Sequence, residues 1–247
     1  MASQKTIKIR VKRYIPEKAE EPFYSEYDVP YSEDMVVLDA LNYIKDNLDG
    51  SLSFRWSCRM GVCGSCSANV DGKPKLTCSS FLKESKGDSI LVEPLSHFRT
   101  IKDLVVEIDV FVKKLKSIKP WIIRNEEKPI ADGEYLQTPE QRDLIKQTSM
   151  CINCMLCYEA CPVFDMDNDF IGPAAAAISY RSVMDSRDDG AKERLDILTS
   201  KHGVWDCTYI GECSTVCPKA VDPALAIQKL KAMGGISIIK SLLPKKK

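Results

Sequence analysis

The chain has 247 residues, of which 44% are hydrophobic, so it can bury the core of one large domain or two modest ones. Its 35 basic and 35 acidic residues balance, which leaves no broad basic field and argues against nucleic-acid binding. No apolar signal core follows the basic start, and no stretch approaches the roughly 18–20 apolar residues of a membrane span. We therefore expect a globular chain that does not itself cross a membrane.

The first part of the chain combines short strand patterns with one helical pattern. Alternating or β-branched residues predict strands over residues 7–11, 23–29, 67–70, 74–77 and 90–92. Apolar residues at helical spacing predict a helix over 36–48, and Asp71-Gly72 predicts a hairpin turn. The last strand is expected to close the sheet, which gives a small α+β unit.

The second part reads as helical. Thr138-Pro139-Glu140 is a typical helix start, with threonine as the cap and proline at the first helical position. The charged segment 125–135 contains proline and glycine and predicts a loop. Helical periodicity is found over residues 101–115, 173–184, 191–199 and 223–233. We predict two domains, residues 1–105 and 106–247.

Eleven cysteines are the most informative feature of the composition. An odd number without a secretory signal argues against a disulfide framework and favours metal binding. The first block contains Cys58, Cys63, Cys66 and Cys78. The second block contains Cys151, Cys154, Cys157, Cys161, Cys207, Cys213 and Cys217.

The first block has the spacing C-x4-C-x2-C followed by a distant fourth cysteine, Cys78, as in plant-type [2Fe–2S] ferredoxins. Gly61 and Gly64 permit the backbone turns and close approach that a loop around a compact inorganic core requires. Arg59 lies inside the loop, where its charge would stabilise a reduced cluster. A structural zinc site is the alternative, but zinc sites usually pair two short cysteine knuckles, whereas here we expect Cys78 on the strand facing the loop.

The second block begins with C-x2-C-x2-C-x3-C-P over residues 151–162, the pattern of bacterial two-cluster ferredoxins, in which the fourth cysteine binds the other cluster. A second copy covers residues 207–218, but Ile210 stands where its middle cysteine should be. Isoleucine cannot bind iron, so one cluster lacks a fourth ligand and should be [3Fe–4S].

These rules distribute all eleven cysteines over three clusters. The predicted [2Fe–2S] ligands are Cys58, Cys63, Cys66 and Cys78. The predicted [4Fe–4S] ligands are Cys151, Cys154, Cys157 and Cys217. The predicted [3Fe–4S] ligands are Cys161, Cys207 and Cys213.

At this point the sequence resembles the iron–sulfur subunits of the succinate dehydrogenase and quinol:fumarate reductase family. The resemblance spans essentially the whole chain. Its motifs are Arg55–Met60 with the loop that follows, both cysteine runs, Phe170–Ala174, Asp185–Asp188 and Val221–Pro223. It implies a β-grasp [2Fe–2S] ferredoxin domain followed by an all-α helical ferredoxin domain with two clusters.

The resemblance also implies partners. A flavoprotein subunit with covalent FAD interconverts succinate and fumarate, and membrane-anchor subunits support a quinone site. The chain would join them as a subunit that binds no substrate, with the order FAD, [2Fe–2S], [4Fe–4S], [3Fe–4S], quinone. The expected location is the cytoplasmic side of the inner (plasma) membrane of a prokaryote, as a peripheral protein.

The direction of the reaction depends on residues near the third cluster. Succinate:ubiquinone reductases of the family have a histidine where this chain has Thr208 and a tryptophan pair where it has Asp165-Met166. Thr208 therefore resembles the menaquinol-using fumarate reductases, and Gln228 and Lys231 match polar positions near their quinone. The alternatives are a turn-capping role for Thr208 and a solvated Lys231. We favour quinol:fumarate reductase over succinate dehydrogenase, with menaquinone as the quinone.

Two functions from other classes compete with this interpretation. A free multi-cluster ferredoxin shuttle would usually be acidic, and a zinc-stabilised interaction module would contain neither iron nor sulfide. His97 and His202 are expected to be structural or exposed rather than ligands, while Trp56 and Trp205 are expected to form a dry shell near the clusters. The apolar segment 236–243 and the basic residues 245–247 suggest either contact with anchor or lipid, or a frayed tail.

Overall fold

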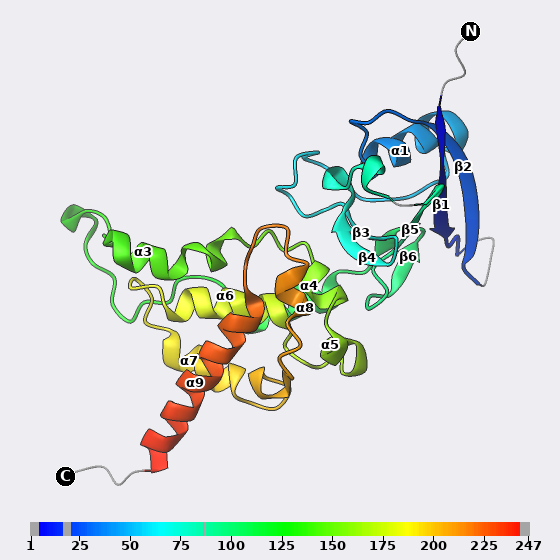
Figure 1. Ribbon diagram of the computed structural model, residues 1–247. Helices are drawn as coiled ribbons and strands as arrows, with labels where there is room; N and C mark the ends of the chain where they lie inside the picture. Colours follow the sequence, from blue (N-terminus) through cyan, green and yellow to red (C-terminus); the bar gives the residue numbers. More distant parts are fainter. Residues whose placement is uncertain (1–4, 17–20, 86, 243–247) are drawn as a thin grey trace, which may run out of the picture. The chain divides into compact units, whose positions relative to one another are not determined.

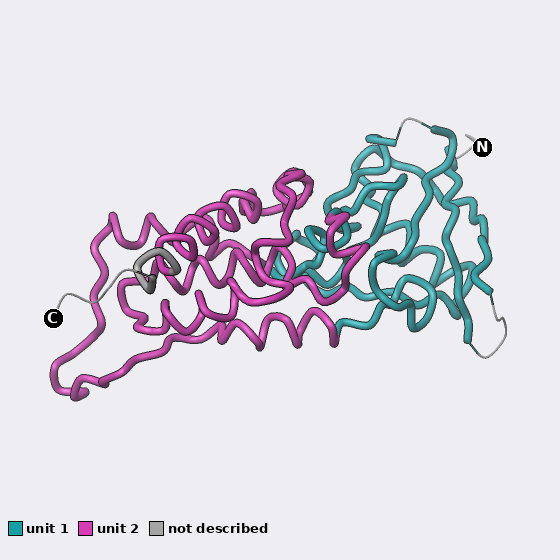
Figure 2. Tube along the Cα trace, turned by 90° about the horizontal axis from the view of Figure 1, so that it is seen from below, with its two compact units in different colours: residues 1–108, 152–160 teal, residues 109–151, 161–247 magenta. Residues whose placement is uncertain are grey.

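The computed structural model describes residues 5–16, 21–85 and 87–242, with side chains up to residue 237. The chain divides into two compact units (Figure 2). The first contains residues 1–108 and 152–160, and the second contains residues 109–151 and 161–247. The first unit is built around a sheet and the second from helices, so the α+β class expected from the sequence is confirmed (Figure 1).

A five-stranded sheet forms the first unit, in the order β2-β1-β5-β3-β4. Its strands are β1 (Thr6–Arg13), β2 (Phe23–Pro30), β3 (Ser67–Val70), β4 (Lys73–Leu76) and β5 (Ser89–Glu93). β1 and β5 are parallel, whereas β1–β2, β3–β4 and β3–β5 are antiparallel. The strand predicted over 90–92 is present, but it lies in the middle of the sheet and joins two hairpins.

The core of this unit lies between the sheet and the helix α1 (Val37–Tyr43), which continues into the π turn η1 (Ile44–Leu48). Ile9 and Val11 of β1 are fully buried, whereas Lys8 and Arg10, which alternate with them, are exposed. This alternation is what the period of two in a strand requires. Leu41 and Ile44 from the helical segment pack into the same core.

The hairpin predicted at Asp71-Gly72 joins β3 to β4, and both turn residues have positive φ, 51° and 71°. Such angles suit the tight turns that match strand twist. The sequence places Cys78 on the strand facing the first cysteine loop. It lies instead in the 3-10 turn η2 (Thr77–Ser79) directly after β4.

The helix predicted over 101–115 is wrong in its first half. Residues there form the two-stranded hairpin β6 (Thr100–Lys102) and β7 (Val105–Val106), and α2 (Asp109–Ser117) begins only afterwards. The hairpin turns at Asp103, which has a positive φ of 47° and is fully buried. Apolar spacing alone could not show that this aspartate has a buried partner.

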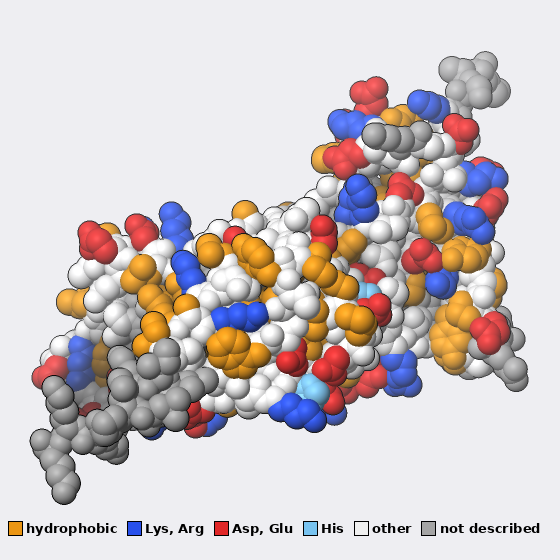
Figure 3. All heavy atoms as spheres, turned by 60° about the horizontal axis from the view of Figure 1, so that its bottom comes forward, with side chains coloured by type: hydrophobic (Ala, Val, Ile, Leu, Met, Phe, Trp, Pro, Cys, Tyr) orange, Lys and Arg blue, Asp and Glu red, His pale blue; other side chains and the backbone are white. Residues whose placement is uncertain are grey.

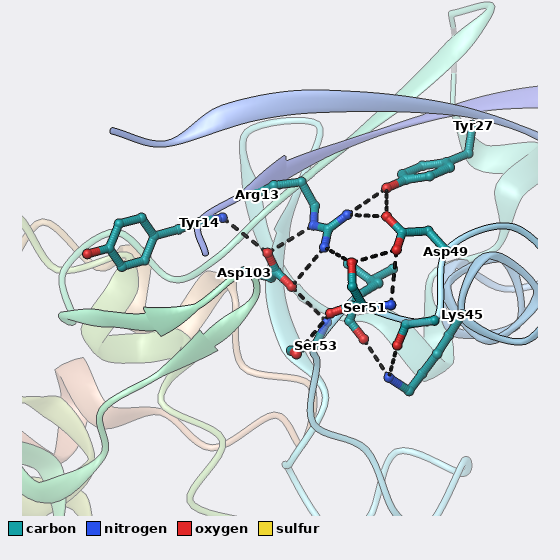
Figure 4. A network of polar contacts seen from close by, with 10 residues as sticks. Arg13, Tyr14, Tyr27, Lys45, Asp49, Ser51, Ser53 and Asp103 are labelled. Atoms are coloured by element: carbon teal, nitrogen blue, oxygen red, sulfur yellow. Dashed lines mark hydrogen bonds and ion pairs between the residues drawn. The ribbon is translucent and has the colours of Figure 1, made fainter. Parts of the chain in front are cut away.

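That partner is Arg13 at the end of β1 (Figure 4). Its guanidinium donates to Asp103 Oδ1 at 2.9 Å and to Asp49 Oδ2 at 2.6 Å. The Ser51 hydroxyl, and to a smaller extent the bond from Arg13, hold the pKa of Asp49 well below its ordinary value. Asp103 also accepts from Ser53 N at 2.8 Å. The network therefore anchors the segment that leads into the first cysteine loop.

The second unit contains most of the helices. They are α2, α3 (Pro139–Lys146), α5 (Pro162–Met166), α6 (Pro173–Val183), α7 (Ala191–Leu198), α8 (Glu212–Thr215) and α9 (Pro223–Leu242). The expected start of α3 is confirmed, because Thr138 and Gln141 cap each other through backbone and side chain. The loop predicted over 125–135 contains only the short 3-10 turn η4 (Ile130–Asp132).

Helix α6 packs against α9 and α7 and is almost entirely buried, with Ala175, Ala176 and Ala177 inaccessible. These small side chains allow the helices of the unit to approach closely. Helix α9 continues to Leu242, beyond the predicted end at residue 233. The predicted apolar and basic tail falls largely on residues outside the described side chains.

Among the described residues, no helix combines the length and apolarity needed to traverse a bilayer. On the face shown in Figure 3, acidic and basic side chains are interspersed with apolar ones. This distribution agrees with the balanced charge of the sequence.

Candidate iron–sulfur centres

The first cysteine loop presents its backbone N–H groups to a sulfur. Cys58 Sγ accepts from the N–H groups of Cys63 and Val62, each at 3.3 Å, and of Met60 at 3.5 Å. These bonds, that of Met60 above all, lower the pKa of Cys58 to about 6. The loop is thus shaped to stabilise a thiolate, the form that binds iron.

All four predicted [2Fe–2S] ligands gather at this loop. The Cys63 thiol donates a hydrogen bond to Cys58, and the Cys78 thiol donates one to Cys66. Burial, followed by the proximity of Cys66 and Cys58, raises the pKa of Cys78 to about 11. None of these four cysteines forms a disulfide. Four converging thiols with N–H groups directed at sulfur fit a [2Fe–2S] cluster.

Glycine at position 64 is required by the fold of this loop. It has a φ of +73°, and a Cβ there would lie 2.6 Å from the carbonyl oxygen of Ile152 and 3.1 Å from the Cα of Cys154. Ser67 donates its hydroxyl to the carbonyl of Cys154 at 2.7 Å. The first cysteine loop and the start of the second cysteine run therefore touch within the first unit.

The two cysteine runs of the second block share one backbone conformation. Cys151 follows the 3-10 turn η5 (Thr148–Met150) with φ −62° and ψ 127°, and Cys207 follows η6 (Val204–Asp206) with φ −66° and ψ 123°. Two positions further, Asn153 and Tyr209 both have positive φ, 56° and 62°.

The match continues up to the short helices that end the two runs. Met155 has φ 66° and ψ −3°, and Gly211 has φ 88° and ψ −9°. Helix α4 (Leu156–Glu159) and helix α8 then begin at equivalent positions. This register places Ile210 where the first run has Cys154. The Ile210 side chain is 58% exposed and offers no ligand atom.

Three thiols come together in the second unit. Burial raises the pKa of Cys161, and the nearby Cys207 raises it further. Hydrogen bonds from the N–H groups of Phe164 and Val163 lower it in part. Burial likewise raises the pKa of Cys213 to about 11, with added contributions from Cys161 and Cys207. These residues are the predicted [3Fe–4S] ligands, and a set of three fits a cluster one ligand short.

The predicted [4Fe–4S] ligands are divided between the units. Cys154 and Cys157 are buried in the first unit, while Cys151 and Cys217 pack against the hydrophobic core of the second. Their assignment to a single cluster stays a prediction.

The polar residues expected near a quinone lie around Cys207. Lys231, on α9, donates its ammonium to the carbonyl of Cys207 at 2.7 Å and is only half-exposed, unlike a freely solvated helix lysine. Gln228 lies one turn earlier, and its Nε2 is buried without a hydrogen-bond partner. Thr208 is exposed. A buried amide without a partner is costly unless a ligand or water bonds to it.

Both histidines have structural contacts, as expected. His97 Nδ1 lies 3.0 Å from the carbonyl oxygen of Tyr158, and His202 pairs with Asp167 at 2.8 Å. The expectation of a dry tryptophan shell is wrong for the indoles themselves, because Trp56 is 40% and Trp205 44% exposed.

Two polar residues next to predicted cluster ligands, Ser67 and Glu159, were missed in the sequence. Their only signal is position: Ser67 follows the ligand Cys66, and Glu159 stands between Cys157 and Cys161. The partners of both lie far away in the chain.

Comparisons with known proteins identify an iron–sulfur domain in each part of the chain. Residues 8–113 match the family model of the 2Fe-2S iron-sulfur cluster binding domain, and residues 147–221 match the 4Fe-4S dicluster domain. A cluster-binding family favours [2Fe–2S] over zinc in the first block.

Curated relatives extend the similarity to the whole chain. The fumarate reductase iron-sulfur subunit of Mycobacterium tuberculosis is 53% identical over 96% of both chains. That of Haemophilus influenzae is 46% identical over the full length of both. The succinate dehydrogenase iron-sulfur subunit of Paracoccus denitrificans is 38% identical over 92% of this chain and 87% of its own.

A chain of the Mycobacterium smegmatis Sdh1 complex in the apo form has the same fold, with a TM-score of 0.82 at 24% identity, over 98% of this chain and 100% of that one. Together with the cysteine sites, these similarities show that the chain belongs to the family of fumarate reductase and succinate dehydrogenase iron–sulfur subunits.

Proposed function

We propose that the chain is the electron-transfer subunit of a membrane-bound quinol:fumarate reductase and holds three clusters. The [2Fe–2S] ligands are the four cysteines of the first block, and Cys151, Cys154, Cys157 and Cys217 hold the [4Fe–4S] cluster. Cys161, Cys207 and Cys213 hold the [3Fe–4S] cluster. Bound in this way, the clusters supply one-electron redox chemistry.

The observation that carries this proposal is the position of Ile210. It stands where the first run has Cys154, in a run with the same backbone conformation, and the three thiols of Cys161, Cys207 and Cys213 converge in the second unit. A structural zinc ion takes four ligands, so zinc binding does not explain why the second run lacks one thiolate. A cubane-type cluster that lacks one iron needs only three ligands.

The protein residues have clear tasks in this function. Backbone N–H groups at Cys58, and at Cys161 those of Val163 and Phe164, stabilise the charge on sulfur. Lys231 orients the carbonyl of Cys207 and places a positive charge beside it. Gln228 Nε2 is a donor available to a quinone oxygen, and Thr208 contributes a hydroxyl on the exposed side.

The proposed partners are an FAD-containing flavoprotein subunit, membrane-anchor subunits and a quinone, with menaquinone favoured. The proposed location is a peripheral position on the cytoplasmic side of a prokaryotic inner membrane, and the bacterial origin of the relatives supports a prokaryotic membrane. Succinate:quinone reduction by the same subunit is the alternative, supported by the 38% identical relative.

The test is to purify the complex through a tag on this chain and compare two assays. We expect a flavoprotein and membrane proteins to copurify, and menaquinol plus fumarate to react faster than succinate plus ubiquinone. A faster succinate reaction would favour the alternative direction. Isolation of the tagged chain alone, still able to exchange electrons, would contradict membership of a complex and support a ferredoxin shuttle.

A further inference from the structure

Glu159 is a buried carboxylate at the end of the helix that carries Cys157. Only 7% of the residue is exposed, and it stands two positions after Cys157 in α4. None of the described ion pairs includes Glu159. A charge in this setting is costly unless other groups replace the water that it loses.

Neutral donors replace that water. Oε1 accepts from Asn69 Nδ2 at 2.7 Å, from Ser96 N at 2.8 Å and from Ser96 Oγ at 2.6 Å. Oε2 accepts from His97 N at 3.0 Å. Every one of these partners donates, so both oxygens act as acceptors, as an ionised carboxylate does. Bonds of this kind are short and charge-assisted.

The same strand holds Glu159 and the backbone of a predicted cluster ligand. Ser67 donates to the carbonyl of Cys154, and Asn69, two residues further along β3, donates to Glu159. Alternate residues of a strand face the same side of the sheet. Both bonds, and both cysteines of α4 and its preceding loop, lie in the first unit. The carboxylate is therefore fixed in position relative to Cys154 and Cys157.

The second cysteine run has no counterpart of this charge. Thr215 occupies the position equivalent to Glu159 and is exposed. The acidic residue of that run, Glu212, is also exposed, so water screens it.

We propose that Glu159 is a positioning residue that lowers the reduction potential of the cluster held by Cys154 and Cys157, which rests on the ligand set proposed above. One-electron reduction adds one negative charge to the cluster and no proton. A fixed anion in a region of low dielectric disfavours that added charge, and net charge is among the factors that set cluster potentials. Its four hydrogen bonds also hold α4 against β3 and the loop of residues 94–97.

The experiment uses the intact complex and a redox titration followed by EPR. We expect Glu159→Gln to keep most hydrogen bonds and shift the [4Fe–4S] potential to more positive values, with a smaller shift at [3Fe–4S]. The matched control is Glu212→Gln, which removes an exposed carboxylate next to Cys213 and should leave all potentials close to the wild type.

A second variant separates charge from packing. Ser96→Ala removes one donor but keeps the carboxylate, so the [4Fe–4S] potential should move the opposite way, to more negative values. If Glu159 had a purely structural role, the two variants would not shift the [4Fe–4S] potential in opposite directions. An unchanged potential in both variants, or shifts of the same sign, would overturn the inference. If Glu159→Gln does not assemble, Ser96→Ala decides alone: a negative shift supports the inference and an unchanged potential refutes it.

An error in the proposed [4Fe–4S] ligands would give a different result. In that case the wild-type complex itself would show no reducible [4Fe–4S] centre, before any variant is compared.

Discussion

Single residues decide which cluster each cysteine run can hold. Ile210 has the backbone surroundings of Cys154 but an aliphatic side chain, and Gly211 supplies the left-handed turn that Met155 supplies in the first run. The difference between the two runs is thus a difference in one ligand and not in the shape of the loop. A thiol at position 210 should therefore need no rearrangement of the backbone.

We predict that Ile210→Cys converts the [3Fe–4S] centre into a four-iron cluster, because a fourth thiolate can then hold the missing iron. EPR of the oxidised protein should lose the [3Fe–4S] signal, and iron analysis should show added iron. Ile210→Ala, a small side chain without a ligand atom, is the control and should retain the three-iron signal. An unchanged spectrum in Ile210→Cys would contradict the register.

Two glycines of the first loop differ in their surroundings although their φ angles are similar. Gly61, at +65°, has open space where a Cβ would lie, whereas Gly64, at +73°, faces the backbone of Ile152 and Cys154. We predict that Gly61→Ala costs about 1–2 kcal/mol through its left-handed φ. Gly64→Ala should cost more and reduce cluster content. Thermal unfolding and sulfide analysis check this, and equal effects of the two variants would be inconsistent with the contact.

At the scale of elements, polar bonds attach the secondary structure to the cysteine loops. The Arg13 network fixes the end of β1, the β6–β7 turn and the segment before Cys58 in one place (Figure 4). Helix α9 does the same for the second run through Lys231 and the carbonyl of Cys207. Each cysteine loop is irregular by itself and depends on such attachments.

We predict that Lys231→Met lowers the potential of the [3Fe–4S] centre, because it removes a positive charge and a hydrogen bond next to a ligand. Lys229→Met is the control, since Lys229 is exposed on the same helix. Redox titration with EPR detection measures both. Equal shifts in the two variants would show that Lys231 acts only through the general charge of α9.

For the molecule as a whole, the sequence predicted the features that depend on local chemistry. The alternation in β1, the Asp71-Gly72 turn and the Thr138 cap are all found where the residues placed them. The cysteine spacings also predicted that the four thiols of the first block lie together and that three thiols of the second block do so, because short loops keep their thiols close.

The features that were missed depend on contacts between distant residues. Arg13 fits the basic pattern of β1 but is buried by Asp103, 90 residues away. Glu159 takes its donors from residues 62 to 90 positions away. Residues 101–115 have apolar spacing that suits a helix, yet the buried turn at Asp103 makes a hairpin of their first part. The pattern of neighbouring residues in the sequence cannot indicate partners that lie this far away in the chain.

In the function proposed above, the chain binds three iron–sulfur clusters, one of them a ligand short because of Ile210. EPR of the wild-type complex, purified without oxygen, tests it most directly. We expect a [3Fe–4S] signal in the oxidised protein and a [2Fe–2S] signal after reduction. Zinc in place of iron and sulfide, or an oxidised protein without a three-iron signal, would contradict it.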